Sequence, residues 1–170
     1  MSPQISDELR TRVAQIRLLA LDSDGVLTDG GVYMLEDGRE FRRFDIKDGL
    51  GLKRVMEAGI AVAIISGADA LTVVQRAQKL GIAEAHIGVK DKLACLLEIC
   101  QRMSLTLDQV AYMGDDLPDL PVLERVGLPC TPADAVASVK DRALWIASKP
   151  GGFGAVRELC DLLLETRGKS

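Results

Sequence analysis

The feature that most constrains this chain is a short apolar run, IRLLAL, that ends directly in the acidic tetrapeptide DSDG. Residues 16–21 are apolar apart from one arginine, a pattern typical of a central strand buried on both faces. Asp22 and Asp24 follow this strand and are separated by one residue. Both carboxylates are therefore expected at the carboxyl edge of a sheet, where ligands bind in open α/β folds.

Two carboxylates on a rigid strand end suit a hard cation such as Mg²⁺, together with a carboxylate nucleophile beside an acid or base. Taken alone, DSDG fits an Asx-type turn equally well. An EF-hand calcium loop fits poorly, because counting from Asp22 places Val26 and Leu27 where an acid and a glycine belong. The choice between a site and a turn depends on the other strand ends.

Composition excludes several classes of function. The 170 residues are 48% hydrophobic and carry a net charge of −4, with no basic patch of interleaved aromatic residues, so nucleic acid is not an expected partner. No apolar run approaches the roughly 18 to 20 residues of a membrane span, and residues 1–12 lack the apolar segment of a signal peptide. We expect a cytoplasmic protein with no membrane partner.

The cysteines and the single histidine narrow the chemistry further. Four widely spaced cysteines form no CxxC pair, and His86 is the only histidine, which argues against a zinc site and a disulfide framework. Buried thiols in a reducing compartment are expected. A single histidine disfavours a catalytic triad based on Ser-His or Cys-His, so any catalysis is expected to use carboxylates, lysine, hydroxyls and metal.

Apolar strands alternate with amphipathic helices along the chain. The patterns predict strands at residues 16–21, 60–65, 85–88, 110–113, 127–130 and 144–147, and helices at residues 6–14, 50–59, 69–80, 93–103, 133–140 and 155–166. This alternation is typical of an α/β fold, a Rossmann-like doubly wound parallel sheet. We expect residues 1–170 to form a single domain.

Polar chemistry follows four of these strands in succession. After the first strand come the two aspartates described above, and the later strand ends carry a hydroxyl, an ammonium and further carboxylates: Ser66, Lys92, Asp115, Asp116 and Asp119. Right-handed crossovers bring the carboxyl ends of parallel strands to one edge of the sheet. We therefore expect these side chains to converge.

Each of these residues also has a purely structural interpretation. Ser66 before Gly67 suits an N-cap, and Lys92 at a helix start suits a solvated surface charge. Asp115 and Asp116 suit helix capping, although adjacent acids at the end of an apolar strand repel each other unless a cation lies between them. The common order of the four strand ends favours a site over separate coincidences.

This order, DxDG followed by a strand-end Ser, then Lys, then GDDxxD, resembles the haloacid dehalogenase (HAD) superfamily over nearly the whole chain. Within it, DSDGVLTDG, DIKDGLGLK, IISG, GDDLPDLPVL and GGFGAVRELCDLLL are similar to the small cap-less group typified by 3-deoxy-D-manno-octulosonate 8-phosphate phosphatase. The resemblance implies a HAD-like fold and a Mg²⁺-dependent phosphatase, a phosphoric monoester hydrolase. Its substrate would be a sugar-acid phosphate of lipopolysaccharide precursor synthesis, or the 9-phosphate of a sialic-type sugar.

The resemblance also implies a role for each residue. Asp22 would be the nucleophile, forming an aspartyl-phosphate, and Asp24 the general acid and base. Mg²⁺ would be held by Asp22, the main-chain carbonyl of Asp24, and Asp115. Ser66 would hydrogen-bond a phosphoryl oxygen and Lys92 would neutralise phosphoryl charge. The remaining implied positions are the supporting residues Gly67, Asp116 and Asp119 and the substrate contacts Asp48 and Gly49.

Residues 30–46 alternate around Asp37-Gly38, a pattern typical of a β-hairpin inserted after the first strand. In the resembled group, the hairpin of each subunit covers the site of a neighbour in a tetramer. The insert here matches that hairpin and is too small to form a lid domain, so we expect a homotetramer. A hairpin that merely extends the subunit's own sheet is the alternative.

The match departs from the group at one informative place. Ala68 and Asp69 stand where members usually carry Arg and Lys, which removes two positive charges suited to a sugar carboxylate. The substrate therefore stays open between the octulosonate 8-phosphate and another phosphorylated sugar acid or small metabolite.

Two hypotheses come from other classes of protein. A phosphoacceptor receiver domain uses similar residues, but it would place its acceptor Asp on a middle strand, where this chain has Ser66. A catalytically silent assembly module is disfavoured by the intact set of Asp22, Asp24, Lys92 and Asp115.

Overall fold

The computed structural model describes residues 6–168. Residues 1–5, on which the expected absence of a signal peptide partly depends, lie outside this range. The described residues contain a six-stranded sheet, all of whose pairings are parallel, in the order β5-β4-β1-β6-β7-β8. Its strands are β1 (Leu18–Leu21), β4 (Ala61–Ile65), β5 (Glu84–His86), β6 (Val110–Met113), β7 (Leu128–Thr131) and β8 (Trp145–Ile146).

This strand order confirms the predicted doubly wound sheet. From β1 the chain winds outward through β4 to β5, and from β6 it winds outward in the opposite direction to β8. The direction therefore reverses between β1 and β6, which are direct neighbours. Such a switch point opens a crevice at the carboxyl ends of the two strands, and this crevice is the usual ligand site of the fold.

The central strand β1 is fully buried, as its apolar sequence predicts. Successive side chains point to opposite faces of a strand, so Leu19 and Leu21 join one hydrophobic cluster, whereas Leu18 and Ala20 join another. Because β1 is paired with β4 on one side and β6 on the other, its carboxyl end is held in a fixed position.

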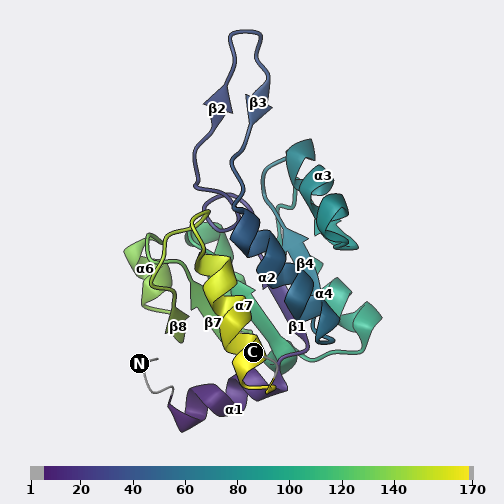
Figure 1. Cartoon of the computed structure of the whole chain (residues 1–170), viewed down its shortest axis with the longest axis vertical. Coiled ribbons are helices and arrows are strands. Elements are labelled where there is room, and N and C mark those ends of the chain that lie inside the picture. The colour runs from purple at the N-terminus through teal and green to yellow at the C-terminus, as the bar shows by residue number, and fades with distance from the viewer. Residues whose placement is uncertain (1–5, 169–170) are drawn as a thin grey trace.

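Helices cover both faces of the sheet (Figure 1). One cluster contains residues of α1 (Asp7–Gln15), α2 (Ile46–Glu57), α3 (Leu71–Leu80) and α7 (Ala155–Glu165). The other contains residues of α4 (Lys92–Met103), α5 (Leu120–Leu123) and α6 (Ala137–Lys140). In the described part of the chain no helix is long and apolar enough to cross a membrane.

The expected hairpin is present and extends away from the body of the molecule (Figure 1). Its strands are β2 (Tyr33–Met34) and β3 (Glu40–Phe41), which pair with each other and form their own two-stranded sheet. Gly38 turns the chain with a φ of 84°. The hairpin is therefore a separate arm in this chain and does not extend the main sheet.

Several predicted boundaries differ from the structure, among them three helix starts. Helix α2 begins at Ile46, before residue 50, because the Asp45 carboxylate caps it by accepting from the Lys47 amide. Helix α3 begins at Leu71 instead of residue 69. Helix α6 begins at Ala137 instead of residue 133, because residues 133–136 form a turn in which the Val136 amide donates to the Asp115 carbonyl.

The glycine-rich loop at residues 151–154, directly before α7, contacts the loop that follows β1. At Gly151 a Cβ atom would overlap the Gly25 carbonyl, and at Gly152 it would overlap the backbone of Thr28 and Asp29. Only glycine permits this close backbone approach. The loop that carries Asp22 and Asp24 thus packs against a segment that is distant in sequence.

We predict that Gly151→Ala lowers the free energy of unfolding by roughly 1 to 3 kcal/mol, because the added methyl group must displace backbone atoms. Chemical denaturation measures the change. Gly67→Ala is the matched control, since its Cβ would meet only the Val89 carbonyl oxygen at 3.7 Å. Equal stability of the two variants would contradict the close approach.

Candidate active site

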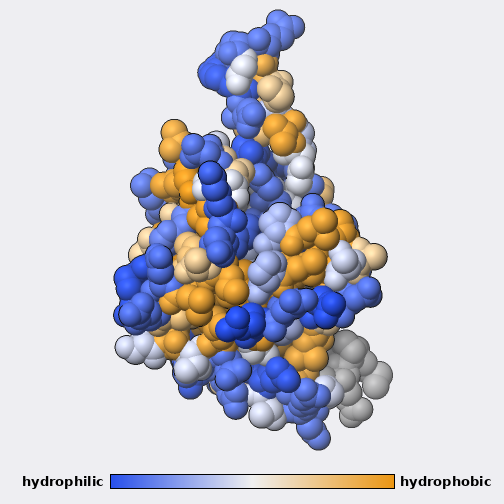
Figure 2. Space-filling model, turned by 180° about the vertical axis from the view of Figure 1, so that it is seen from behind, coloured by the Kyte–Doolittle hydropathy of each residue, from blue (hydrophilic) through white to orange (hydrophobic). Residues whose placement is uncertain are grey.

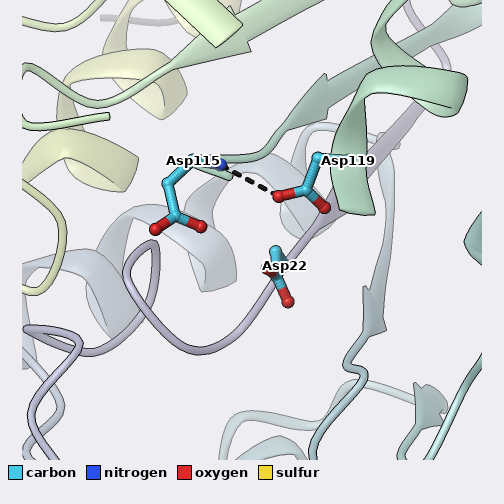
Figure 3. Close-up of side chains that lie close together, drawn as sticks. All are labelled: Asp22, Asp115 and Asp119. Carbon is cyan, nitrogen blue, oxygen red and sulfur yellow. Dashed lines mark hydrogen bonds between the residues drawn. The ribbon is translucent and has the colours of Figure 1, made fainter. Parts of the chain in front are cut away.

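Three aspartates meet where β1 and β6 end. Asp22 follows β1, Asp115 follows β6, and Asp119 lies in the short 3₁₀ turn Leu117–Asp119. Figure 3 shows the three side chains close together, with the Asp115 amide donating to the Asp119 carboxylate. One oxygen from each lies within 4.8 Å of the others. The predicted convergence of acids from separate strand ends is therefore observed.

Lys92 lies among these acids and not at the surface. It is 6% exposed at the first position of α4, which Asp91 caps. Its Nζ atom is 2.8 Å from Asp22 Oδ2 and 2.7 Å from Asp119 Oδ1. Burial opposes its charge, but Asp22 and Asp119 together raise the pKa of Lys92 above its usual value. Lys92 is thus a fixed, charged ammonium at the site.

Asp119 has four hydrogen-bond donors around it. Its Oδ1 accepts from Lys92 Nζ and, at 2.6 Å, from the Tyr112 hydroxyl. Its Oδ2 accepts from the amides of Asp115 at 3.0 Å and Asp116 at 3.3 Å. Since its oxygens are already engaged, Asp119 is suited to support the loop and Lys92 rather than to bind a metal. Sequence reasoning missed Tyr112, because nothing distinguishes it within the buried strand VAYM.

Asp22 and Asp115 are destabilised as anions. Burial and, next, the charge of Asp119 raise the pKa of Asp22 to about 7, against the opposing effect of Lys92. Burial, followed by the charge of Asp22, raises the pKa of Asp115 to about 7. The cluster therefore has more negative charge than its own lysine can balance.

A divalent cation fits this cluster. Asp115 Oδ1 is buried and accepts no hydrogen bond from the described residues. Asp115 lies against Gly25, where a Cβ would overlap its carboxylate, so glycine leaves room for the carboxylate in the loop. Oxygen donors of this kind are the ligands that Mg²⁺ prefers. Asp22 and Asp115 would hold the ion, and their role as metal ligands, with the carbonyl of Asp24, stays a prediction.

A cavity of about 300 Å³ opens over the cluster. Its lining includes every predicted catalytic and metal residue and two of the three supporting ones: Asp22, Asp24, Ser66, Gly67, Lys92, Asp115 and Asp116. The Ser66 hydroxyl accepts from the Ala68 amide at 3.2 Å, so its hydrogen remains available to a ligand oxygen. The Asp24 carboxylate is bound by Arg42, at 2.8 Å from Oδ1 to Nε.

Asp48 and Gly49 are not brought to this cavity. Asp48 is 1% exposed on α2, where its carboxylate accepts from the Arg157 amide at 2.8 Å. Burial raises its pKa to about 6. Gly49 lies against the Arg76 side chain. Substrate contact by these two residues stays a prediction, and their surroundings indicate a role in joining helices.

Fold and site together define a class of protein. Residues 86–156 match the family described as haloacid dehalogenase-like hydrolase. The order of the aspartates after the first strand, the strand-end serine, the lysine and the acids after β6 is the pattern on which the resemblance to that class rests.

The similarity to individual proteins is more specific. The chain is 42% identical over 165 residues to the 3-deoxy-D-manno-octulosonate 8-phosphate phosphatase KdsC of Escherichia coli K12, covering 97% of this chain and 88% of that protein. A crystal structure of a hypothetical protein from Xanthomonas campestris superposes with a TM-score of 0.96 at 44% identity, covering 99% of this chain and 92% of that one. The chain belongs to the family of 3-deoxy-D-manno-octulosonate 8-phosphate phosphatases.

One similar structure carries ligands. The 3-deoxy-D-manno-octulosonate 8-phosphate phosphatase of Moraxella catarrhalis, in complex with magnesium ion, phosphate ion and KDO, superposes with a TM-score of 0.93 at 36% identity. The alignment covers 95% of this chain and 93% of that one. Magnesium in that relative agrees with the oxygen donors of the acidic cluster here.

The raised pKa values of Asp22 and Asp115 predict how stability varies with pH in EDTA. In the unfolded chain these carboxyls lose their protons near pH 4, whereas the folded protein retains them to about pH 7. The folded state therefore binds more protons between these values, so its free energy of unfolding falls as pH rises from about 4 to 7. Mg²⁺ should offset this loss, most strongly above about pH 7.

Thermal unfolding at about pH 5 and about pH 8, in EDTA and in Mg²⁺, tests this prediction. Asp115→Asn is the control and should show a smaller pH-dependent loss and a smaller Mg²⁺ effect. A wild-type midpoint in EDTA with the same pH dependence as Asp115→Asn would contradict the assignment.

Proposed function

We propose that this protein is a Mg²⁺-dependent phosphatase that hydrolyses 3-deoxy-D-manno-octulosonate 8-phosphate in lipopolysaccharide precursor synthesis. The observation that carries the proposal is the buried contact of Lys92 with Asp22 at 2.8 Å, inside a cavity that Asp24 and Ser66 also line. Family membership over nearly the full chain supports the sugar-acid substrate.

Asp22 begins the reaction in this mechanism. Its Oδ attacks the phosphorus atom and forms an aspartyl-phosphate while the bond from phosphorus to the sugar oxygen breaks. Asp24 supplies a proton to the departing sugar oxygen and later takes one from the water that hydrolyses the intermediate. Ser66 donates its hydroxyl to a phosphoryl oxygen, and Lys92 offsets the charge that develops there.

Mg²⁺ held by Asp22, Asp115 and the predicted carbonyl of Asp24 would offset the repulsion between the nucleophilic carboxylate and the phosphate dianion. The supporting residues keep this arrangement in place. Asp119 restrains Lys92 and the amides of Asp115 and Asp116 at the same time. The mechanism thus assigns one function to each group at the cavity.

Another phosphorylated sugar acid, such as a sialic-type 9-phosphate, is the second candidate substrate. Ala68 lines the cavity where group members usually carry a cation. Among the described residues that line the cavity, Lys92 is the one basic side chain, and it is engaged with Asp22 and Asp119. A substrate with a different anionic group is compatible with this lining.

We predict that Asp22→Asn abolishes phosphate release, a loss of at least about 10³-fold, because the amide cannot act as the nucleophile. The measurement is phosphate release with Mg²⁺ across a panel of phosphorylated sugars and sugar acids. A strong preference of the wild type for the octulosonate 8-phosphate supports the proposed substrate, whereas preference for a 9-phosphate supports the second candidate. Turnover by Asp22→Asn near the wild-type rate would refute the mechanism.

We also infer a homotetramer in which each hairpin covers a neighbour's site. The hairpin exposes five large apolar side chains: Val32, Tyr33, Met34, Leu35 and Phe41. Figure 2 shows apolar residues along this arm, below a hydrophilic tip. Such a surface is costly in water and favours a protein contact.

Four free cysteines support a cytoplasmic location, where thiols stay reduced.

Light scattering should give four times the 18.3 kDa chain mass, and Met34→Glu should lower both this mass and the activity. A charge at Met34, which is 65% exposed on β2, would have to be desolvated in the interface. Leu97→Glu is the control, because Leu97 is 43% exposed on α4. A monomeric wild type with full activity would exclude the proposed assembly.

A further inference from the structure

Residues 42–45, which join β3 to α2, form the base of the hairpin and are called the hairpin stem here. An arginine of this stem contacts Asp24, the general acid and base of the proposed mechanism. Arg42 Nε lies 2.8 Å from Asp24 Oδ1, and its Nη2 lies 3.4 Å from Asp24 Oδ2. The two contacts form a fork in which one guanidinium edge faces one carboxylate. Glu40 contacts the third nitrogen of Arg42 at 3.3 Å.

This ion pair differs from an ordinary surface pair. The Arg42 side chain is 7% exposed, whereas Asp24 is 36% exposed and lines the cavity. Exposed pairs contribute little, but a buried guanidinium must keep its partners because an unpaired buried charge is costly. Burial of the Arg42 side chain therefore favours keeping its ion pair with Asp24.

Arg42 reaches Asp24 from outside the catalytic cavity. It lines a separate cavity between the hairpin stem and α3, together with Phe41, Phe44 and Ile46. The Asp24 carboxylate thus contacts Arg42 and also lines the cavity over Asp22, which Arg42 does not line. In this position Arg42 can set the direction of the carboxylate without occupying the space where the substrate would bind.

The stem around Arg42 is fixed on both sides. Thr28 and Phe44 form an antiparallel bridge that joins the stem to the loop carrying Asp24. Arg43 donates to the Gly152 carbonyl at 2.5 Å, and its guanidinium lies 4.3 Å from the centre of the Phe153 ring. The Arg42 fork is therefore presented by backbone that is anchored to the loop behind the site.

We propose that Arg42 is a positioning residue that holds the Asp24 carboxylate in the orientation for proton transfer to the leaving oxygen. The proposal rests on the proposed function. Oδ1 is the anchored oxygen, and Oδ2, with the longer contact, is the one that exchanges the proton. The neutral carboxyl group carries that proton on Oδ2 and passes it to the bridging oxygen as the bond from this oxygen to phosphorus breaks and the bond from Asp22 to phosphorus forms. This transfer leaves Asp24 ionised and paired with Arg42. Proton transfer requires this alignment within hydrogen-bond reach.

The test compares two leaving groups. A sugar alkoxide needs a proton to depart, whereas p-nitrophenolate departs without one, so only the first reaction depends on the orientation of Asp24. The measured quantity is kcat/KM, which covers the steps up to departure of the leaving group. Arg42→Ala should lower it by about 10- to 100-fold for the preferred sugar phosphate and by less than about threefold for p-nitrophenyl phosphate.

Two further variants separate orientation from charge and from folding. Arg42→Lys keeps the charge but loses the fork, so it should recover only part of the loss. In an Asp24→Asn background, Arg42→Ala should cause no additional loss that depends on the leaving group, because the coupled partner is already gone. Arg142→Ala removes an exposed contact with Glu124 and should leave both reactions unchanged.

Equal losses for the two substrates, full recovery by Arg42→Lys, or an additive effect in the Asp24→Asn background would each overturn the positioning role. These outcomes are independent of the identity of the substrate, since any alkyl phosphate that the wild type hydrolyses can serve. A failure of the proposed function appears in the wild-type substrate panel, and a failure of the Arg42 proposal appears only in the ratio between leaving groups.

Discussion

The site depends on an imbalance of charge at the end of β1. Asp22, Asp115 and Asp119 are brought together by the parallel sheet, and Lys92 is the ammonium that lies among them. One lysine cannot balance three carboxylates in a largely buried place, so the pKa values of Asp22 and Asp115 rise to about 7. The same imbalance that disfavours the empty cluster favours a divalent cation, and a cation is what an aspartate nucleophile needs to approach a phosphate dianion.

The sequence predicts the main parts of this arrangement because they follow from local patterns and general rules of topology. Apolar runs mark the strands, and right-handed crossovers place their carboxyl ends at one edge, so Asp22, Ser66, Lys92 and Asp115 could be assigned to one site. Tyr112 could not, because a tyrosine in a buried strand looks like any other core residue until its hydroxyl is seen to reach Asp119. Its contact depends on side-chain direction, which spacing along the chain does not reveal.

A local cap and contacts between distant segments account for the other differences between expectation and structure. The helix after the hairpin begins at Ile46, and not at residue 50, because the Asp45 side chain caps it. The sequence does not indicate a role for Arg42 at the site, since its pairing with Asp24 spans 18 positions. The hairpin stem and the loop after β1 contact each other, and both contact the Gly151 loop, so a segment distant in sequence helps to position the site.

The departures at Ala68 and Asp69 connect substrate recognition with assembly. Lys92 is the one basic residue among the described residues that line the cavity, and its charge is already engaged with Asp22 and Asp119. A sugar carboxylate therefore needs a cation from elsewhere. Arg39, which follows Gly38 at the hairpin turn, has a side chain that is 76% exposed and paired with Asp37, and it does not line this subunit's cavity. In the proposed tetramer a neighbour's hairpin would supply such a charge, so a chain without the basic pair would depend more on its assembly for recognising an acid sugar.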